Sequence, residues 1–133
     1  MTLIFTLDNK NGTRCMGKRQ SKDVVVADRI VMQAENLPLR MKHKSLKFFP
    51  CVPAHVRFLE SFEELEENDI CFAEEVVPSD VMARADRVIV FRWNRDYPSH
   101  VDDRVSLDGF VKQSTEDFRG HSHDNITMEV YVK

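Results

Sequence analysis

The segment from Asp86 to Pro98, DRVIVFRWNRDYP, carries the densest set of chemically capable side chains in this sequence. An apolar run is followed there by side chains that carry charge, donate hydrogen bonds or stack, namely Arg92, Trp93, Asn94, Arg95 and Tyr97. Trp, Tyr and Arg dominate the energetics of protein interfaces. We therefore predict that this cluster binds a protein partner or a small anionic ligand. The alternative is that the arginines pair with nearby acids and Trp93 packs in the core.

Apolar runs and helical spacing indicate the elements that position this cluster. The run 88–91 is typical of a strand buried on both faces by helices, and 2–7 and 70–73 have the same character. Ser21 is the expected N-cap of a helix over 21–35, with Asp23 in its first turn. The turn formers Asn11 and Gly12 predict a mobile loop over 8–17. Polar groups after a buried strand lie where α/β sheets place their ligand crevice.

Shorter signals complete the predicted order of elements. We expect strands at 39–41 and 56–59 and short helices at 45–49, 62–67 and 78–85. The segments 110–118 and 126–132 alternate apolar with polar residues, which favours a half-exposed antiparallel hairpin. The sequence therefore predicts one α/β domain over residues 1–133, with a mostly parallel sheet and an antiparallel C-terminal edge.

Composition excludes several classes of protein. The chain is 42% hydrophobic with a formal net charge of -3, so it is neither disordered nor attractive to nucleic acid at long range. Cys15, Cys51 and Cys71 are odd in number and form no C-x-x-C pair, which indicates free thiols in a reducing compartment. No signal peptide or membrane-spanning run is visible, so we expect a cytoplasmic protein. The oligomeric state stays open.

The order of these elements resembles the three-layer dihydrofolate reductase fold along nearly the whole chain. The loop NGTRCMG is similar to the mobile loop of those reductases, and MKHKSLKFF at 41–49 is similar to their MGR[HK]TWES segment. Asp23 falls where the family has its buried carboxylate. The resemblance implies a reductase of a pterin- or flavin-like heterocycle, with Asp23 as proton donor. It also implies that His43, Lys44 and Ser45 contact NADPH.

Three departures argue against that chemistry. Glu74 and Glu75 stand where the reductases have a Gly-Gly pair. Each carboxylate beside a cofactor phosphate would cost on the order of several kcal/mol, because like charges repel strongly in an intermediate dielectric. Phe91 replaces a substrate-binding Thr, and His55 lies near the position of a substrate-binding Arg. We therefore predict a non-catalytic binding module without a cofactor, of which an inhibitor would be one form. The NADPH-dependent reductase is the alternative.

The chain also resembles short bacterial proteins that share the segments FNxRRQSxD, YRWNRxYP and SHExITxEVY and are sometimes labelled ribonuclease Z. A ribonuclease of that name needs an H-x-H-x-D-H constellation for two zinc ions, and the segment 121–124, HSHD, offers only its first fragment. We therefore predict no metal site. His121 and His123 remain a minor alternative as metal ligands, and nuclease activity is the second alternative function.

Overall fold

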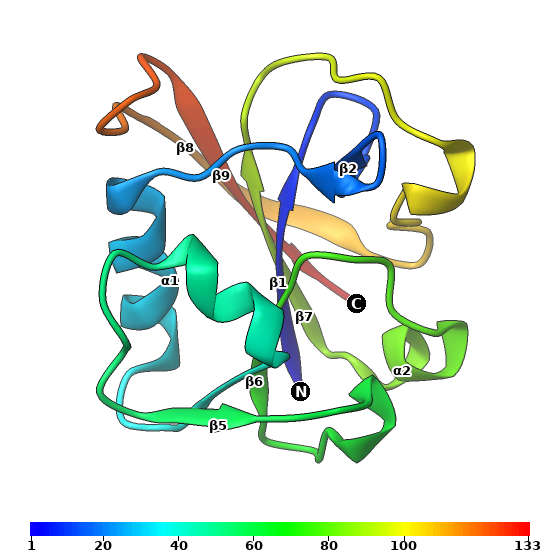
Figure 1. Ribbon diagram of the computed structural model, residues 1–133. Helices are drawn as coiled ribbons and strands as arrows, with labels where there is room; N and C mark the ends of the chain where they lie inside the picture. The colour runs from blue at the N-terminus through cyan, green and yellow to red at the C-terminus, as the bar shows by residue number, and fades with distance from the viewer.

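A seven-stranded sheet forms the centre of the computed structural model, which describes residues 1–133 (Figure 1). Its strand order is β5 (Val56–Phe58), β4 (Leu39–Met41), β6 (Ile70–Ala73), β1 (Thr2–Leu7), β7 (Arg87–Arg92), β9 (Ile126–Val132) and β8 (Val111–Phe118). The first five are parallel, β9 is antiparallel to β7, and β8 is antiparallel to β9. This confirms the predicted α/β fold with its C-terminal hairpin.

Helices cover both faces of the sheet. The helix α1 (Val24–Ala34) and the 3₁₀ helix η1 (His43–Phe48) pack on one face, and α2 (Ser79–Arg84) and η2 (Phe62–Glu64) pack on the other. Successive residues of β7 enter opposite cores, with Val88 and Val90 on the α2 side and Ile89 and Phe91 on the α1 side. The apolar run 88–91 is therefore buried on both faces, as its composition predicts.

The start of α1 differs from the prediction. Asp23, not Ser21, is the N-cap, and its carboxylate accepts hydrogen bonds from the Val25 and Val26 N–H groups at 2.9 and 3.4 Å. The predicted N-cap at Ser21 is wrong because the Ser21 hydroxyl instead faces His123, at the far end of the chain. Asp23 therefore begins the helix and also holds a distant loop.

Several short elements differ in type or bounds from the prediction: η1 (His43–Phe48) begins two residues earlier than expected, and η2 and α2 are shorter. The predicted helices at 45–49 and 62–67 are the 3₁₀ helices η1 and η2, and Pro78 lies before α2 as its N-cap. The loop at 8–17 leads into a small hairpin of β2 (Arg14–Cys15) and β3 (Lys18–Arg19). Met16 and Gly17 turn the hairpin with φ of 51° and 78°. A further 3₁₀ helix, η3 (Val101–Asp103), lies between β7 and β8.

The C-terminal hairpin is not evenly half-exposed. Seven of the eight residues of β8 are exposed, whereas β9 is mostly buried. The alternating pattern is wrong for β8 because this strand is the outermost of the sheet, beyond the cover of the helices. The three cysteines form no disulfide. None of the helices is long and apolar enough to cross a membrane.

Candidate functional site

Arg92 lies at the end of β7 and is held by internal partners. Its Nε is 2.6 Å from Glu129 Oε1 on β9, and its Nη1 donates to the Asp8 carbonyl at 3.0 Å and to Asn11 Oδ1 at 2.7 Å. Glu129 also accepts from the Tyr131 hydroxyl at 2.9 Å. Arg92 therefore joins the turn after β1 to β9, with its side chain 14% exposed.

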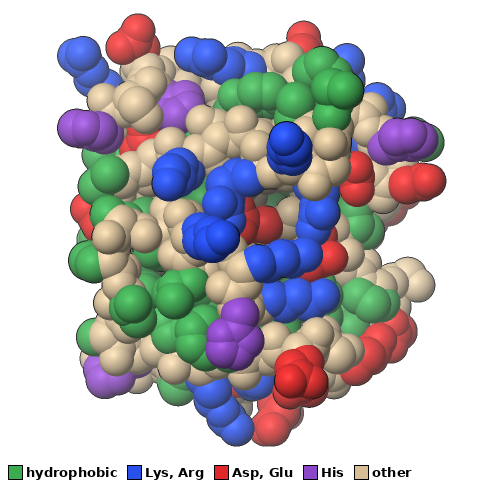
Figure 2. All heavy atoms as spheres, in the orientation of Figure 1, with side chains coloured by type: hydrophobic (Ala, Val, Ile, Leu, Met, Phe, Trp, Pro, Cys, Tyr) green, Lys and Arg blue, Asp and Glu red, His purple; other side chains and the backbone are tan.

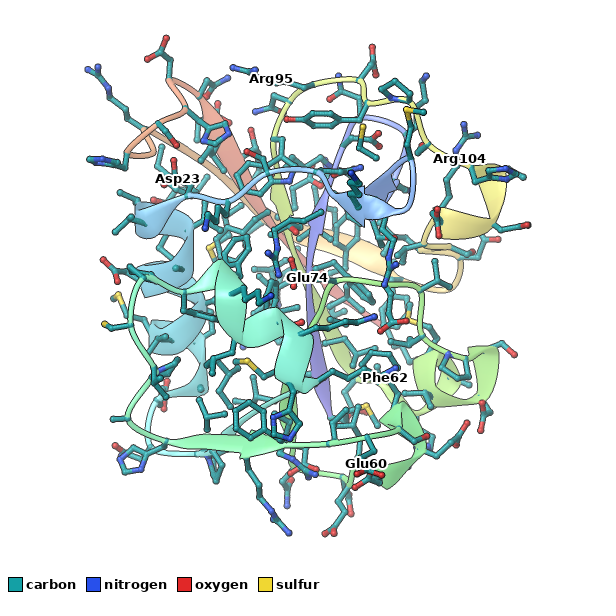
Figure 3. All side chains as sticks on the ribbon, viewed as in Figure 1. Asp23, Glu60, Phe62, Glu74, Arg95 and Arg104 are labelled. Atoms are coloured by element: carbon teal, nitrogen blue, oxygen red, sulfur yellow. The ribbon has the colours of Figure 1, made fainter.

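The other members of the predicted cluster point in different directions. Trp93 is only 1% exposed, and its ring lies 4.8 Å from that of His123. Asn94 donates to Thr127 Oγ1 at 3.0 Å, and Tyr97 packs partly buried against the α1-side core. Arg95 is exposed at the outer edge of the molecule (Figure 3). The five side chains do not form one continuous contact surface, because Trp93 is inside the protein.

Asp23 is the most heavily hydrogen-bonded carboxylate in the structure. Besides capping α1, it accepts from the His121 and Ser122 N–H groups at 3.0 and 2.9 Å, and its side chain is 0% exposed. Burial by itself would raise the pKa of Asp23, but the hydrogen bonds from His121, His123, Ser122 and Val25 hold that pKa well below its usual range. These hydrogen bonds therefore favour the ionised carboxylate over the protonated form that the reductase alternative requires.

His123 connects Asp23 to Ser21. Its Nδ1 lies 2.9 Å from Asp23 Oδ2, and its Nε2 lies 2.8 Å from Ser21 Oγ. The imidazole is 9% exposed and the serine is partly exposed. A row of serine, histidine and aspartate is thus formed across 102 residues of sequence separation. We call it the Ser21–His123–Asp23 row.

Sequence reasoning missed this row, although all three residue types were visible. Ser21 and Asp23 lie just before α1, and His123 lies in the loop between β8 and β9. The sequence alone did not reveal the row, because only the folded chain brings His123 next to Ser21 and Asp23. His121, by contrast, is exposed. No group of three or more His, Cys, Asp or Glu side chains is arranged to hold a metal ion.

A cavity of about 330 Å³ adjoins the row at the start of α1. Figure 3 shows Asp23 at this end of the helix, below the loop between β8 and β9. Apolar side chains from η1 and the residues after it form one wall, and polar groups form the other. The lining residues are Lys22, Asp23, Val24, Phe48, Phe49, Pro50, His121 and Ser122.

A second feature, which we call the basic cleft, lies over the end of β6. The Arg19 guanidinium donates two hydrogen bonds to the Glu74 carboxylate, from Nε to Oε2 at 2.5 Å and from Nη2 to Oε1 at 2.7 Å. Lys42 and Lys44 each place Nζ 3.1 Å from Glu75, and Arg14 lies 3.7 Å from it. A cavity of about 230 Å³ is lined by Arg14, Gly17, Arg19, Lys44, Lys47 and Glu74.

The basic cleft combines charges from three parts of the chain. Figure 2 shows Lys and Arg side chains gathered over the centre of this face, with acidic atoms between them. Burial would raise the pKa of Glu75, but hydrogen bonds from Lys44 and Lys42 lower it. Glu75 is therefore ionised, and five cations face two carboxylates. The cleft keeps an excess of positive charge.

The three residues predicted to contact NADPH are separated by the fold. Lys44 lines the basic cleft with its side chain 54% exposed. Ser45 is 2% exposed within η1, and His43 stacks on Phe58 of β5 with ring centroids 3.9 Å apart. Of the three, only Lys44 lines the basic cleft.

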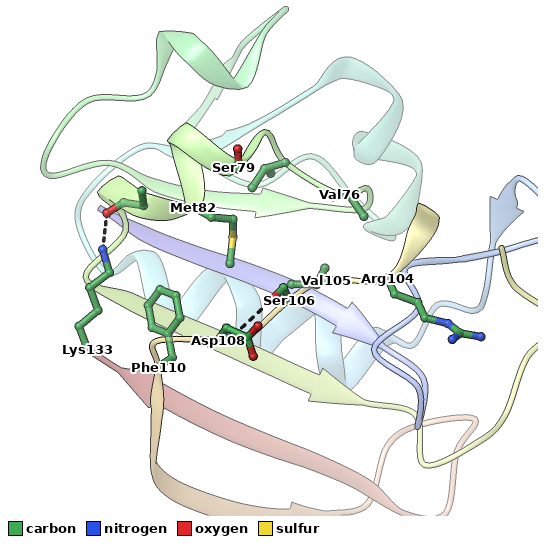
Figure 4. Close-up of a pocket in the computed structure, with 11 residues that line it drawn as sticks. Val76, Ser79, Met82, Arg104, Val105, Ser106, Asp108, Phe110 and Lys133 are labelled. Carbon is green, nitrogen blue, oxygen red and sulfur yellow. Dashed lines mark hydrogen bonds between the residues drawn. The ribbon is translucent and has the colours of Figure 1, made fainter. Parts of the chain in front are cut away.

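A largely apolar cavity of about 420 Å³ lies elsewhere, between α2 and the segment before β8 (Figure 4). Val77 and Val105 line it in the α2-side core, and Met82 and Phe110 form its partly buried wall. Its charged members, Arg104, Asp108 and Lys133, form no ion pair with one another. The arrangement contains no acid–base pair that could do chemistry.

Comparisons with known proteins support the fold. No family model matches the chain, and no curated protein matches it. Among solved structures, the chain is similar to dihydrofolate reductase from Enterococcus faecalis complexed with NADP(H) and RAB-propyl, with a TM-score of 0.59 and 10% sequence identity. The match covers 98% of this chain and 94% of that one. The likeness confirms a dihydrofolate reductase-like fold, and at this identity it shows the fold alone.

Proposed function

We propose that this protein binds a small polyphosphate-like anion in the basic cleft. The observation that carries the proposal is the convergence of Arg14, Arg19, Lys44 and Lys47, from two separate segments, on a single small cavity, with Lys42 paired to Glu75 next to it. Two carboxylates leave three of these positive charges unmatched. An anion that entered the cleft would neutralise that excess and bridge the β2–β3 hairpin to η1.

The type of side chain favours phosphate. A guanidinium presents several donors in a rigid fork that matches phosphate oxygens, whereas a lysine adds a compact positive charge. Arg14 and Arg19 have side chains 25% and 27% exposed, so part of each stays accessible to a ligand in the cleft. A ligand with two linked phosphate groups would reach both the arginines and Lys44 and Lys47 across the cavity.

The structural relative holds NADP(H), so the same group has to be tested against this cleft. Glu74 and Glu75 follow directly after β6, at 10% and 25% exposure, and both form ion pairs at the cleft. A dinucleotide laid across the end of β6 would place its phosphates against these carboxylates, which like-charge repulsion opposes. Pyrophosphate in the cleft would meet the same two carboxylates, so this repulsion opposes both ligands and the parallel titrations below decide between them; we derive no reduction step from NADPH.

Titration calorimetry with inorganic pyrophosphate tests the proposal. We expect binding to the wild type and a loss of at least tenfold in affinity for the Lys44→Ala/Lys47→Ala double variant, roughly the effect of two charge-assisted contacts. Arg57→Ala is the matched control, because Arg57 is an exposed cation on β5 outside the cleft. Glu75→Gln should tighten binding roughly tenfold, because it removes a competing internal anion.

The proposal fails if pyrophosphate does not bind or if the double variant binds it as tightly as Arg57→Ala does. Parallel titrations with NADPH separate the reductase alternative. NADPH binding at least tenfold tighter than pyrophosphate, and unaffected by the lysine substitutions, would favour that alternative over the one proposed.

A further inference from the structure

The Ser21–His123–Asp23 row has the connectivity of an activated serine. Of the two imidazole nitrogens, Nε2 faces the serine hydroxyl at 2.8 Å and Nδ1 faces the carboxylate at 2.9 Å. This is the arrangement in which a histidine accepts the serine proton while the aspartate orients the ring and stabilises the imidazolium that forms. Both distances lie within hydrogen-bond range.

The aspartate in the row is held more firmly than helix capping alone requires. Four backbone N–H groups donate to it, two from α1 and two from the loop after β8. The carboxylate is therefore fixed in position, ionised and fully buried. Trp93, with its ring 4.8 Å from the imidazole, limits the movement of His123 on another side. The histidine is therefore held by three parts of the chain, which are the segment of Ser21 and Asp23, Trp93 and its own loop.

A cavity adjoins the row at Asp23, and Ser21 and His123 are not among the residues that line it. Lys22, which follows Ser21, and Ser122, which precedes His123, both line the cavity of about 330 Å³. The Lys22 N–H has no acceptor in the protein. In hydrolases the N–H of the residue after the nucleophile is a common oxyanion donor. Phe48, Phe49 and Pro50 give this cavity an apolar wall.

We propose that Ser21 is a nucleophile that hydrolyses carboxylic esters with a small apolar acyl group. Ser21 Oγ attacks the ester carbonyl while its proton passes to His123 Nε2. The carbonyl–alkoxide bond then breaks, the alkoxide takes that proton and leaves as an alcohol, and the acyl group remains on Ser21. A water molecule then attacks the acyl group in the same way, with His123 taking its proton and returning it to Ser21 Oγ, which releases a carboxylic acid and restores the serine. Asp23 acts as a positioning residue throughout.

A fluorophosphonate probe tests whether Ser21 is activated. We expect one phosphonyl adduct per chain in the intact wild-type protein, located at Ser21 by peptide mapping. Ser21→Ala should give no adduct, and Ser114→Ala, which changes an exposed serine on β8, should label fully. No adduct at Ser21 in the wild type overturns the proposal.

Hydrolysis of p-nitrophenyl acetate supplies a second, independent readout. We expect the esterase rate to fall at least roughly a hundredfold in Ser21→Ala and in His123→Gln, as loss of a nucleophile or its general base predicts. Unchanged hydrolysis in Ser21→Ala overturns the proposal. Ser21→Ala removes one partly exposed hydroxyl and should fold, so this arm decides the question even if His123→Gln does not fold. Variants of the basic cleft should leave the rate unchanged, which keeps this test separate from the pyrophosphate experiment.

Discussion

Arg92 and Arg95 are the same residue type, three positions apart, in opposite environments. Arg92 satisfies its donors with Glu129, Asp8 and Asn11 and is 14% exposed, whereas Arg95 is exposed and forms no ion pair. A buried ion pair is costly to break from one side, because the remaining charge is left without its partner. The two arginines should therefore respond differently to truncation.

Arg92→Ala should destabilise the protein by about 3 kcal/mol, since Glu129 would remain 9% exposed with only Lys112 as a cationic partner. Arg95→Ala should change the free energy of unfolding by less than about 0.5 kcal/mol, as an exposed substitution does. Urea unfolding of the two variants beside the wild type provides the measurement. Equal stability of Arg92→Ala and the wild type would show that Arg92 is free to serve a binding partner.

Single residues also show where sequence reasoning stops. That Glu74 and Glu75 disfavour phosphates at the end of β6 could be stated from their charge alone. The sequence could not predict which cations surround these two carboxylates, because the partners come from segments about 30 to 60 positions away and ion pairs leave no periodic signal. The partners are Arg14, Arg19, Lys42 and Lys44. These basic side chains outnumber the two carboxylates and form the basic cleft.

At the scale of elements, the position of the loop between β8 and β9 depends on a glycine, Gly120. A Cβ added to Gly120 would lie 2.6 Å from Asp23 Oδ2 and 2.7 Å from Ile126 Cδ1. The Gly120 N–H also donates to the His123 carbonyl at 2.8 Å. Glycine is needed here for close approach, and this approach brings the loop onto the start of α1.

Gly120→Ala should lower the free energy of unfolding by about 2 kcal/mol, because the added methyl group overpacks against the carboxylate and a buried isoleucine. The substitution should also move His123 away from Ser21, so fluorophosphonate labelling of Ser21 should fall with it. Chemical unfolding and probe labelling measure the two effects. Asp124→Ala, an exposed change in the same loop, is the control. A fully stable Gly120→Ala with unchanged labelling would contradict this account.

Helices and strands with a strong apolar pattern in the sequence were predicted correctly. The type and exposure of elements without such a pattern were not. The buried runs at 2–7, 70–73 and 88–91 and the helix spacing after Asp23 carry enough apolar pattern to fix their type. The short segments near Ser45 and Phe62 are 3₁₀ helices of six and three residues, which are too short to show a helical periodicity in the sequence. The exposure of β8 depends on its place at the edge of the sheet, which local pattern does not encode.

On the scale of the whole molecule, the chemically capable groups gather at one edge of the sheet. Glu74 follows β6, Trp93 follows β7 and Asp8 follows β1, and these three parallel strands are neighbours. Loops at the carboxyl ends of parallel strands form the usual crevice of an open α/β sheet. The prediction of a site after the strand 88–91 concerns this same edge and stays a prediction, whereas the basic cleft and the Ser21–His123–Asp23 row take their residues largely from other loops.

The protein as a whole should lose stability in acid. Asp23, Glu75 and Glu129 have side chains 0%, 25% and 9% exposed, and in each case burial opposes ionisation but hydrogen bonds or ion pairs hold the pKa below its ordinary value. A carboxyl group with a lowered folded-state pKa contributes stability above its unfolded pKa, about 4 for Asp and Glu, and loses that contribution as pH falls through the folded value.

Urea unfolding between pH 7 and pH 2 should therefore show a plateau above about pH 5 and a steady decline below about pH 4, where the unfolded chain binds more protons than the folded one. Glu129→Gln should reduce the decline, because one of the three carboxyl groups no longer titrates. Glu116→Gln should leave it nearly unchanged, because Glu116 is 59% exposed and its pair with Arg29 is screened by solvent. Stability that stays constant down to pH 2 would mean that these carboxylates are protonated equally in the folded and unfolded states, and that the ion pairs around Asp23, Glu75 and Glu129 contribute nothing to folding.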